Sequence, residues 1–312
     1  MTINLEGRVA IVTGAGGGLG RSHALALARN GAKVIVNDLG GARDGSGNDV
    51  TAAEAVVEEI RAAGGIAASN GGSVTAMSDV QIMVSDAMER WGRVDILVNN
   101  AGILRDRTFA KLGMDDFRAV VEVHLMGAVN CTKAVWDIMR EQRHGRIVMT
   151  TSSSGLFGNF GQSAYAAAKM GLVGLMNTLH LEGERYNIRV NCISPSAATR
   201  MTDDVYDAEV LHGLGPDCVS PAVVALSADD APSRVIMGAG AGVFERAMIT
   251  LTRGVHIGDC ADAPARILSQ IDRISDRTGE FLPASGPEQS QHEIAMMRDS
   301  TAAAALAEAQ RG

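Results

Sequence analysis

The stretch RVAIVTGAGGGLGRSHALALA, residues Arg8–Ala28, decides the fold. Its first part, Arg8–Thr13, is a short β-branched run that predicts a buried strand, and its Ala/Leu-rich end predicts a helix. Gly14, Gly18 and Gly20 lie between the two, and glycine lets a backbone turn tightly and approach a bound group. The free N–H groups at a helix N-terminus attract anions such as a pyrophosphate. A glycine-rich loop alone is a weak indication, but between a strand and a helix it predicts a dinucleotide site.

The alternation of strand and helix continues along most of the chain. Buried strands are also predicted at Ala32–Asp38, Val94–Asn99, Gly145–Thr150 and Ile188–Ile193, with a shorter one near Ile66. Segments of helical period lie at Asp49–Ala63, Met77–Arg90, Asp115–Arg143 and Gln162–Tyr186. Repeated βα units build a parallel sheet with helices on both faces and a ligand crevice at the carboxyl ends of the strands. The sequence therefore predicts the α/β class, with a Rossmann-type, doubly wound parallel sheet.

The last seventy residues differ in pattern from the rest of the chain. We expect a single domain over residues 1–242, which carries the dinucleotide and catalytic sites, and a C-terminal extension over residues 243–312. From about Val243 the alternation gives way to a polar segment marked by Pro and Gly, and Thr301–Gln310 is an Ala-rich stretch predicted to be helical. We interpret the extension as an appendage that covers the substrate or contacts another subunit.

The composition is that of a folded, acidic protein, with 46% hydrophobic residues, 21% charged residues and a net charge of −8. Without a basic field, nucleic acid is disfavoured as a partner. No apolar run approaches the roughly 18 residues that span a bilayer, and the N-terminus lacks the pattern of a secretory signal. We therefore expect a cytoplasmic protein with no membrane partner. The four cysteines lie far apart and the seven histidines form no HExxH motif, so no metal site is predicted.

Asp38 ends the second predicted strand, about 18 residues beyond the last glycine of the loop. A carboxylate at that point can accept both ribose hydroxyls of an adenosine and repels a 2′-phosphate. Two alternatives remain: Asp38 is a turn residue, or Arg43 in the following loop offsets the repulsion. The position of Asp38 favours NAD over NADP.

Tyr165 and Lys169 lie four residues apart on a predicted helix, so their side chains share a face. An ammonium beside a phenol favours the phenolate and lowers the tyrosine pKa from about 10, which makes Tyr165 a candidate general acid/base. Five hydroxyl residues, Thr150–Ser154, precede the pair, and a hydroxyl there can stabilise charge on a substrate oxygen. The residue pattern does not choose among the five. YxxxK also occurs as a surface pair, but the dinucleotide loop upstream favours the catalytic interpretation.

These motifs together resemble the signature of the short-chain dehydrogenase/reductase family. The resemblance covers about Gly7–Ala241 and rests on TGxxxGxG at Thr13–Gly20, NNAG at Asn99–Gly102, a strand-end serine, and YxxxK at Tyr165–Lys169. It implies a Rossmann-type fold, NAD(P), and reversible oxidation of a secondary alcohol to a ketone.

The resemblance also implies roles for individual residues. Tyr165 is implied to be the general acid/base, and Lys169 is implied to lower its pKa and hold the nicotinamide ribose. The family serine stands thirteen positions before the tyrosine, which implies Ser152. The substrate contacts implied are Ser152, Ser154 and Tyr165. The implied cofactor contacts are Gly14, Gly18, Leu19, Gly20, Asp38, Ser73, Val74, Asn100, Ala101, Gly102, Tyr165, Lys169, Pro195, Ala197 and Thr199.

Longer segments, including VNDLGG, NNAGILRDRTFAKL and SGLFGNFGQSAYAAAK, are similar to one subgroup of the family. This subgroup comprises the (3R)-hydroxyacyl-CoA dehydrogenase part of peroxisomal multifunctional enzyme type 2 and free-standing bacterial relatives. The similarity implies that the chain converts a 3-hydroxyacyl-CoA and NAD⁺ into a 3-oxoacyl-CoA and NADH.

Three positions depart from the family pattern. His124 stands where most members have a catalytic Asn, and Gly72 replaces the acid that usually lies beside the adenine. In the segment after the sixth strand, Pro195 is kept and Ser196 replaces the usual Gly. The role of His124, catalytic or structural, stays open at this point.

Two other functions remain as alternatives. Within the same family, the substrate is a free steroid or another secondary alcohol or ketone instead of an acyl-CoA. In a different class, the chain is a catalytically silent NAD-binding protein, which the intact Ser152, Tyr165 and Lys169 disfavour. The family resemblance also implies a homodimer or homotetramer that pairs the long helices Asp115–Arg143 and Gln162–Tyr186.

Overall fold

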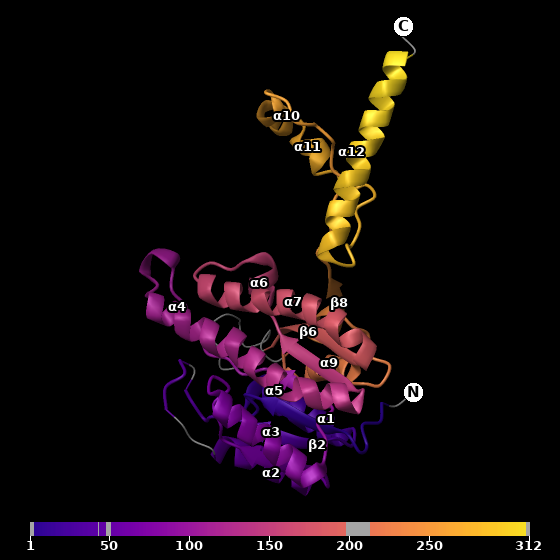
Figure 1. Ribbon diagram of the computed structural model, residues 1–312. Coiled ribbons are helices and arrows are strands. Elements are labelled where there is room, and N and C mark those ends of the chain that lie inside the picture. The colour runs from indigo at the N-terminus through magenta and orange to yellow at the C-terminus, as the bar shows by residue number, and fades with distance from the viewer. Residues whose placement is uncertain (1–2, 43, 48–50, 198–212, 310–312) are drawn as a thin grey trace. The chain divides into compact units, whose positions relative to one another are not determined.

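The computed structural model describes residues 3–42, 44–47, 51–197 and 213–309. It divides into two compact units, Met1–Ala247 and Met248–Gly312. The first unit is built around one eight-stranded sheet (Figure 1). Its strands are β1 (Val9–Thr13), β2 (Lys33–Asn37), β3 (Ile66–Asn70), β4 (Ile96–Asn99), β5 (Gly145–Thr150), β6 (Ile188–Ser196), β7 (Ile236–Gly240) and β8 (Val243–Ala247).

The strand order confirms the predicted Rossmann-type sheet. It runs β3-β2-β1-β4-β5-β6-β7-β8, with β1 at the point where the order reverses. Every neighbouring pair is parallel except β7 and β8, which pair antiparallel. The carboxyl ends of β1, β2 and β4 therefore meet at one edge, where a doubly wound sheet binds its ligands.

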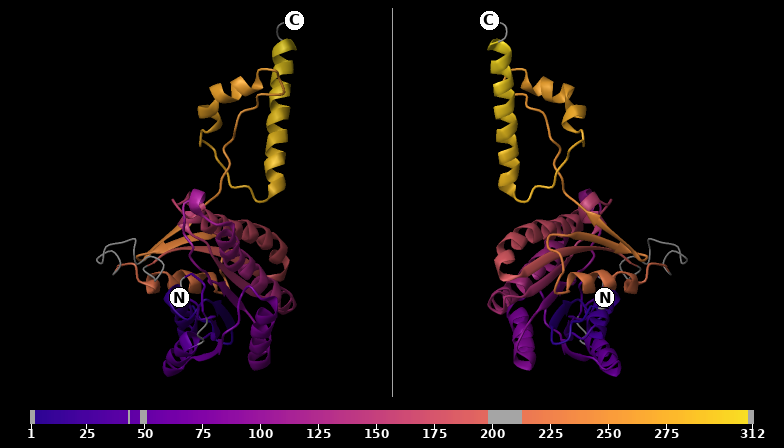
Figure 2. Two further views of the ribbon diagram at one scale, coloured as in Figure 1. Left: turned by 90° about the vertical axis from the view of Figure 1, so that its left-hand side faces the viewer. Right: turned by 90° about the vertical axis from the view of Figure 1, so that its right-hand side faces the viewer.

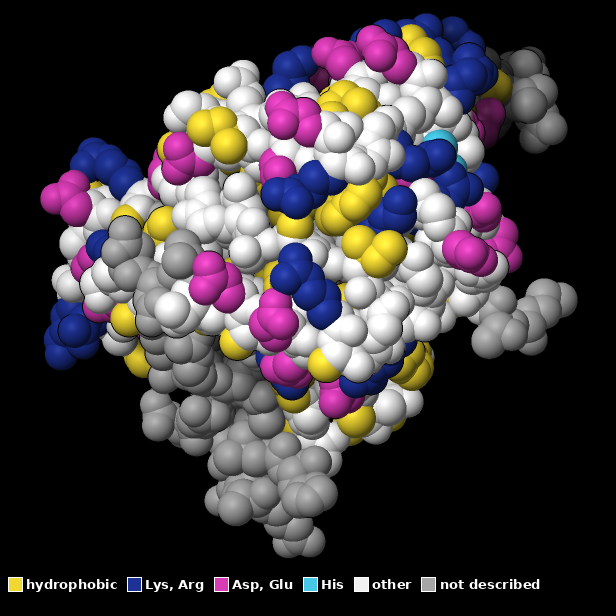
Figure 3. All heavy atoms as spheres, turned by 90° about the horizontal axis from the view of Figure 1, so that it is seen from below, with side chains coloured by type: hydrophobic (Ala, Val, Ile, Leu, Met, Phe, Trp, Pro, Cys, Tyr) yellow, Lys and Arg dark blue, Asp and Glu magenta, His cyan; other side chains and the backbone are white. Residues whose placement is uncertain are grey.

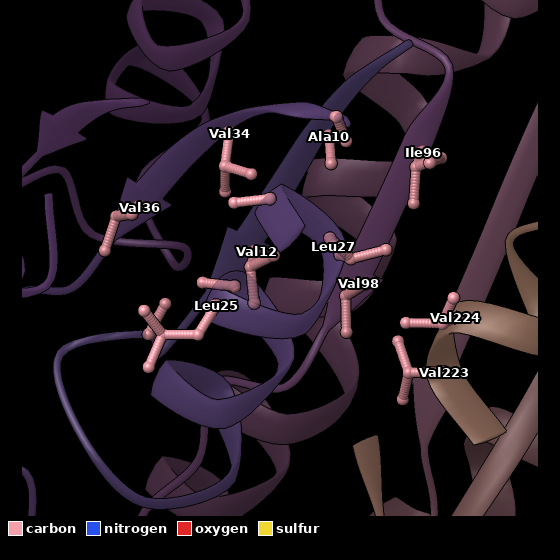
Figure 4. Packing of buried hydrophobic residues seen from close by; sticks show 14 of the residues in the cluster. Ala10, Val12, Leu25, Leu27, Val34, Val36, Ile96, Val98, Val223 and Val224 are labelled. Carbon is pink, nitrogen blue, oxygen red and sulfur yellow. The ribbon is translucent and has the colours of Figure 1, made fainter. Parts of the chain in front are cut away.

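Helices cover both faces of this sheet (Figure 2). On one face lie α1 (Gly18–Arg29), α2 (Thr51–Ala62) and α9 (Ser220–Leu226). On the other lie α3 (Met77–Trp91), α5 (Gly127–Gln142) and α7 (Ser163–Gly183). Side chains alternate across each strand, so Ala10 and Val12 of β1 pack on the first face while Val9 and Ile11 pack on the second. Figure 4 shows the first cluster, where side chains of β1, β2 and β4 meet those of α1 and α9.

The predicted helix Asp115–Arg143 is present over Met114–Gln142, but it is not regular α-helix throughout. It consists of α4 (Met114–Val121), one π-helical turn (Glu122–Met126) and α5. The sequence gives no periodicity signal for such a turn, because a π-turn adds a single residue to an otherwise helical pattern. The turn places His124 against the backbone of Ile103, as described below.

Short elements complete the first unit. They are α6 (Ser153–Phe157) and the 3₁₀ turns Phe109–Lys111, Glu184–Tyr186 and Pro216–Cys218. The sheet extends through β8 to Ala247, five residues into the segment that sequence analysis assigns to the extension. β7 reads IMGAG and β8 is exposed along most of its length, so neither has the pattern of a buried strand.

Two histidines of the first unit are buried for structural reasons. His23 of α1 is fully buried with Nδ1 2.8 Å from Ser220 Oγ, and burial lowers its pKa to about 3. At the amino ends of the strands, His144 Nε2 lies 4.0 Å from Asp95 Oδ1 and 3.9 Å from Asp229 Oδ1. Burial and the neighbouring Arg146 lower the pKa of His144 to about 4. Both imidazoles are therefore neutral at pH 7.

The second unit contains α10 (Ala263–Ser269), α11 (Ile271–Ile274) and α12 (Gly286–Ala309) (Figure 2). Its loops are tied by backbone hydrogen bonds in both directions between Leu251 and Phe281, each 2.9 Å. The Arg253 guanidinium carbon lies over the Phe281 ring, 5.2 Å from the ring centroid, which is within reach of a cation–π contact. The helix predicted within Thr301–Gln310 is the end of α12, which is longer than its Ala-rich part.

Positive and negative side chains are interspersed on the face of the molecule shown in Figure 3. Among the described residues no helix is long and apolar enough to cross a membrane.

Candidate active site

The glycine-rich loop joins β1 to α1 at the reversal point of the sheet. Gly14 has a φ of +63°, and a Cβ on Gly20 would overlap the Gly14 carbonyl oxygen, so the loop requires glycine at both positions. The N-cap of α1 is Gly17, which has no side chain to bond the first N–H groups of the helix. The helix N-terminus is therefore available to an anion, and the loop fits the pyrophosphate of a dinucleotide.

Asp38 follows β2 and lies on the wall of the cavity next to this loop. One carboxylate oxygen accepts a hydrogen bond from Gly16 N at 2.7 Å, and the other accepts one from Gly40 N at 2.7 Å. Two backbone donors thus fix the carboxylate in place before any ligand arrives. This orientation suits a group that accepts hydrogen bonds from ribose hydroxyls.

The NNAG motif at the end of β4 is bonded to the end of β1. Asn100 donates from its side chain to the carbonyls of Thr13 and Gly14, each at 3.0 Å. The Thr13 hydroxyl accepts hydrogen bonds from the backbone N–H groups of Asn100 and Ala101 at 3.0 and 3.1 Å. These bonds hold together two loops that are distant in sequence, and both loops line the cavity described next.

A cavity of about 450 Å³ lies against the glycine-rich loop and the NNAG motif. Ten of the predicted cofactor contacts line it: Gly14, Gly18, Leu19, Gly20, Asp38, Ser73, Val74, Asn100, Ala101 and Gly102. The cavity lining does not include Tyr165, Lys169, Pro195 or Ala197. Two other residues considered for cofactor binding, Thr199 and Arg43, lie outside the described residues. The predicted adenosine and pyrophosphate contacts are therefore brought together in one cavity.

The region where the family acid is missing has its own hydrogen-bond network. Asn37 donates to Asn70 Oδ1 at 2.9 Å and to the Gly72 carbonyl at 2.8 Å. Asp79 accepts from Ser73 N at 3.0 Å. The carboxylate of Asp79 thus stabilises the turn at Ser73, beside the cavity wall formed by Gly72 and Ser73.

Ser152, Tyr165 and Lys169 come together at the carboxyl end of β5. Tyr165 is partly buried, and desolvation raises the pKa of its phenol; a hydrogen bond with Ser152 acts in the opposite direction, and the charge of Asp106 raises it further. The Lys169 ammonium lies 5.4 Å from the centroid of the Tyr165 ring. It donates to the Thr150 carbonyl at 2.6 Å, and burial lowers its pKa to about 7.

The direction of the Tyr165 shift differs from the sequence-based expectation. From the sequence we expect Lys169 to lower the pKa of Tyr165, whereas in this structure desolvation of the phenol outweighs the favourable Ser152 contact. The Lys169 amine is itself buried and donates to a backbone carbonyl. Burial penalises the charged forms of both groups.

The five hydroxyls before Tyr165 have distinct positions. Ser152 is the N-cap of α6 and accepts a hydrogen bond from Ser154 N at 3.2 Å. Thr151 donates to the Lys169 carbonyl at 2.8 Å, which ties α7 to the end of β5. Ser153 and Ser154 belong to α6, so both lie beyond the end of the strand. The strand ends at Thr150, because the Ser152 cap starts a helical turn there.

His124 is buried beside the tyrosine. Its ring meets that of Tyr165 edge-on, with centroids 5.1 Å apart and an interplanar angle of 87°. Nε2 lies 2.7 Å from the Ile103 carbonyl and 3.0 Å from Ile103 N, and Nδ1 has no hydrogen-bond partner among the described residues. Burial and the charge of Lys169 lower the pKa of His124 to about 3, so its ring is neutral. These contacts show that His124 holds the backbone after the NNAG motif next to the tyrosine.

Several cavity residues were missed by the motif analysis. They come from the glycine-rich insert after Asp38, from the segment after NNAG and from the turn at α4: Leu39, Gly41, Ala42, Gly45, Ile103, Arg105, Ala119, Glu122 and Val123. The glycines of the insert after Asp38 were the feature of the sequence that could have identified the insert as part of the cavity wall. Among the described residues no group of His, Cys, Asp and Glu could hold a metal ion.

Comparison with protein families gives a match over residues 8–209 to the short chain dehydrogenase family. A short-chain type dehydrogenase/reductase of Mycobacterium tuberculosis is 49% identical over 283 residues, covering 90% of this chain and 96% of that protein. The peroxisomal hydratase-dehydrogenase-epimerase of Saccharomyces cerevisiae is 50% identical over 243 residues, covering 78% of this chain. This chain spans only 27% of the length of the yeast enzyme.

Two solved structures are similar along most of the chain. Full-length peroxisomal multifunctional enzyme type 2 from Drosophila melanogaster has a TM-score of 0.78 and 34% identity, covering 95% of this chain and 50% of that one. A 7α-hydroxysteroid dehydrogenase complexed with NADH and 7-oxo glycochenodeoxycholic acid has a TM-score of 0.69 and 30% identity, covering 77% of this chain and 96% of that one. The family match supports a nicotinamide dinucleotide as the cofactor. The chain belongs to the short-chain dehydrogenase/reductase family and is an oxidoreductase that acts on alcohols.

Proposed function

We propose that the chain is an NAD-dependent dehydrogenase that interconverts a 3-hydroxyacyl-CoA and a 3-oxoacyl-CoA, as in β-oxidation of a fatty or steroid side chain. The observation that carries the dehydrogenase chemistry is a partly buried phenol, Tyr165, with a hydroxyl partner in Ser152 and an amine, Lys169, over its ring. The acyl-CoA part is supported by the subgroup motifs and by similarity to enzymes named hydratase-dehydrogenase-epimerase and multifunctional enzyme type 2.

Each residue has a defined task in this proposal. The nicotinamide, when bound, accepts or donates the hydride. Ser152 binds the substrate oxygen and stabilises charge that develops on it. Tyr165 takes the hydroxyl proton during oxidation and returns it during reduction. Lys169 stabilises the phenolate form of Tyr165 electrostatically and binds the nicotinamide ribose.

The choice of NAD rests on Asp38. Its carboxylate lines the cavity and is fixed by Gly16 N and Gly40 N, so it cannot turn away from a 2′-phosphate without losing both bonds. We expect NADH to bind about ten- to a hundredfold more tightly than NADPH, since each factor of ten corresponds to about 1.4 kcal/mol of unfavourable charge contact. Fluorescence titration with both dinucleotides measures the ratio.

Asp38→Asn keeps the shape and one acceptor oxygen of the side chain but removes its charge, so the preference should fall to a few-fold. Asp115→Ala is the matched control, because Asp115 is an exposed carboxylate on α4. Tighter binding of NADPH than of NADH by the unaltered chain would contradict the role of Asp38.

The acyl-CoA assignment is tested by shortening the carrier. With the same 3-hydroxyacyl group on a short thioester in place of CoA, kcat/KM should fall by roughly tenfold or more, because binding energy from remote parts of a substrate supports the chemical step. NADH formation measured at 340 nm follows the reaction. Equal rates with both thioesters would rule out recognition of CoA.

A free steroid is the second candidate substrate. The similarity to a 7α-hydroxysteroid dehydrogenase is the observation that favours it, at 30% identity over 77% of this chain. A rate with a free hydroxysteroid above that with every 3-hydroxyacyl-CoA tested would select this alternative. A silent NAD-binding protein would turn over neither class.

We also propose a homodimer or homotetramer and a cytoplasmic location. Exposed apolar side chains on or next to the long helices, namely Met126, Met170 and Leu181, support an oligomer, and similarity to a bacterial protein along most of the chain supports the location. Leu268 and Ile271 of the second unit are also exposed, which supports its role as a substrate cover or subunit contact. A monomeric mass by sedimentation equilibrium would contradict the oligomer.

A further inference from the structure

A glycine-rich segment after Asp38 lines the cavity on the side of the predicted cofactor. We define the strap as residues 39–42 and 44–47. Leu39, Gly41, Ala42 and Gly45 of the strap are among the cavity-lining residues. The strap is internally bonded, with Ala42 N donating to the Ser46 carbonyl at 2.7 Å and Ser46 N to Asp44 Oδ1 at 3.0 Å. It is therefore a structured wall of the cavity.

The strap joins the two ends of the cofactor cavity. At its start, Gly40 N is bonded to Asp38, where the adenosine ribose is predicted to lie. At Gly45 it packs against Ile103, beyond the NNAG motif. A Cβ on Gly45 would lie 3.0 Å from Ile103 Cγ2, and Gly45 has a φ of +87°, so close packing and backbone both require glycine there.

Arg105, in the segment after the NNAG motif, is hydrogen-bonded to the strap. Its Nε donates to the Asp44 carbonyl at 3.1 Å, and its Nη1 donates to Asp116 Oδ1 at 2.9 Å. Asp116 lies in the first turn of α4, and Ala119 of α4 and Glu122 and Val123 of the following π-helical turn line the same cavity. One guanidinium thus joins the strap to α4.

We infer that Arg105 is a positioning residue that retains the dinucleotide by holding the strap against α4, and so sets the rate at which NADH is released. The inference rests on the proposed function, because it takes a dinucleotide as the ligand of this cavity. The alternative role for Arg105 is direct attraction of the cofactor phosphates by its positive charge.

The two roles predict opposite effects of removing Asp116. If Arg105 holds the strap against α4, the Asp116→Ala substitution weakens that attachment and speeds the release of NADH. If Arg105 acts by charge on the phosphates, Asp116→Ala unmasks that charge and slows release. Arg105→Ala speeds release in either case, so the carboxylate variant decides between them.

The experiment is stopped-flow displacement of NADH from the full-length chain, followed by NADH fluorescence, with no acyl-CoA present. We expect Arg105→Ala and Asp116→Ala each to release NADH about three- to tenfold faster, the size expected for a half-exposed ion pair with one further charge-assisted hydrogen bond. Association rates should stay within about twofold. Arg107→Ala is the matched control, since it removes the same charge two residues away and should leave release unchanged.

A second measurement needs no substitution. Raising the salt concentration to about 1 M screens the Arg105–Asp116 pair, so it should speed release from the unaltered chain more than from Arg105→Ala. Unchanged or slower release by Asp116→Ala, or an equal effect of Arg107→Ala, would overturn the inference and leave the proposed function standing. Failure of the unaltered chain to bind NADH would overturn both.

Discussion

Replacing Tyr165 with Phe is expected to lower kcat by about a hundred- to ten-thousandfold, the range over which a positioned general acid/base contributes to a rate. The exchange removes one hydroxyl and keeps the ring, so the edge-on contact with His124 at 5.1 Å is preserved. The dinucleotide cavity is lined by other residues, so the affinity for NADH should stay within about twofold of the unaltered value.

Steady-state rates with NAD⁺ and a 3-hydroxyacyl-CoA, together with NADH titrations, measure the two quantities separately. Tyr186→Phe is the matched control, because Tyr186 is a phenol outside the site, stacked with Arg140 and Arg185. Retention of more than about a tenth of kcat by Tyr165→Phe would remove this residue from the chemistry.

The free energy of unfolding is expected to fall steeply as the pH drops below about 6.5. His23 and His124 have folded-state pKa values of about 3, and His144 has one of about 4, all lowered chiefly by burial. Between pH 6.5 and 4 the unfolded chain binds protons at these positions that the folded chain does not, so acid favours unfolding. Each group contributes about 1.4 kcal/mol per pH unit, so three together approach about 4 kcal/mol per unit near pH 5.

Urea unfolding at pH 7, 6 and 5 measures this slope. His144→Asn should flatten it by about 1.4 kcal/mol per unit, whatever its effect on stability at pH 7. His256→Asn, which changes an exposed histidine of the second unit, should leave the slope unchanged. A free energy of unfolding that stays constant from pH 6.5 to 5 would mean that the buried imidazoles accept protons without unfolding.

Much of this fold could be predicted, because β1, β2, β4, β5 and β6 contain β-branched residues in short apolar runs that lie between helical patterns. β7 and β8 could not, since IMGAG and VFERA have neither the run nor the alternation of a strand. Their pairing depends on Ile236 and its neighbours meeting β6 in three dimensions. The break at Glu122–Met126 also depends on tertiary contact, since it accompanies the packing of His124 on the Ile103 backbone.

The candidate site divides in the same way. Residues at strand ends, such as Asp38 and Asn100, could be placed from the topology, because parallel strands bring their carboxyl ends to one edge. The hydrogen bond of Lys169 to Thr150 could not be predicted from the topology, since it depends on the local path of the backbone after β5. The hydrogen bond between Arg105 and Asp44 could not be predicted either, because the two residues are 61 positions apart in loops without a motif.

The π-turn at Glu122–Met126 makes the chain sensitive to its own length at this point. Successive residues of a helix are rotated by about 100°, so a deletion that restored a regular α-helix would rotate α4 by that amount relative to α5. His124 would lose its contact with the Ile103 carbonyl, and Ala119 of α4, which lines the cavity, would point away from it. Evolution along this helix is therefore expected to proceed by exchange of residues at constant spacing, with insertions and deletions confined to the loops on either side.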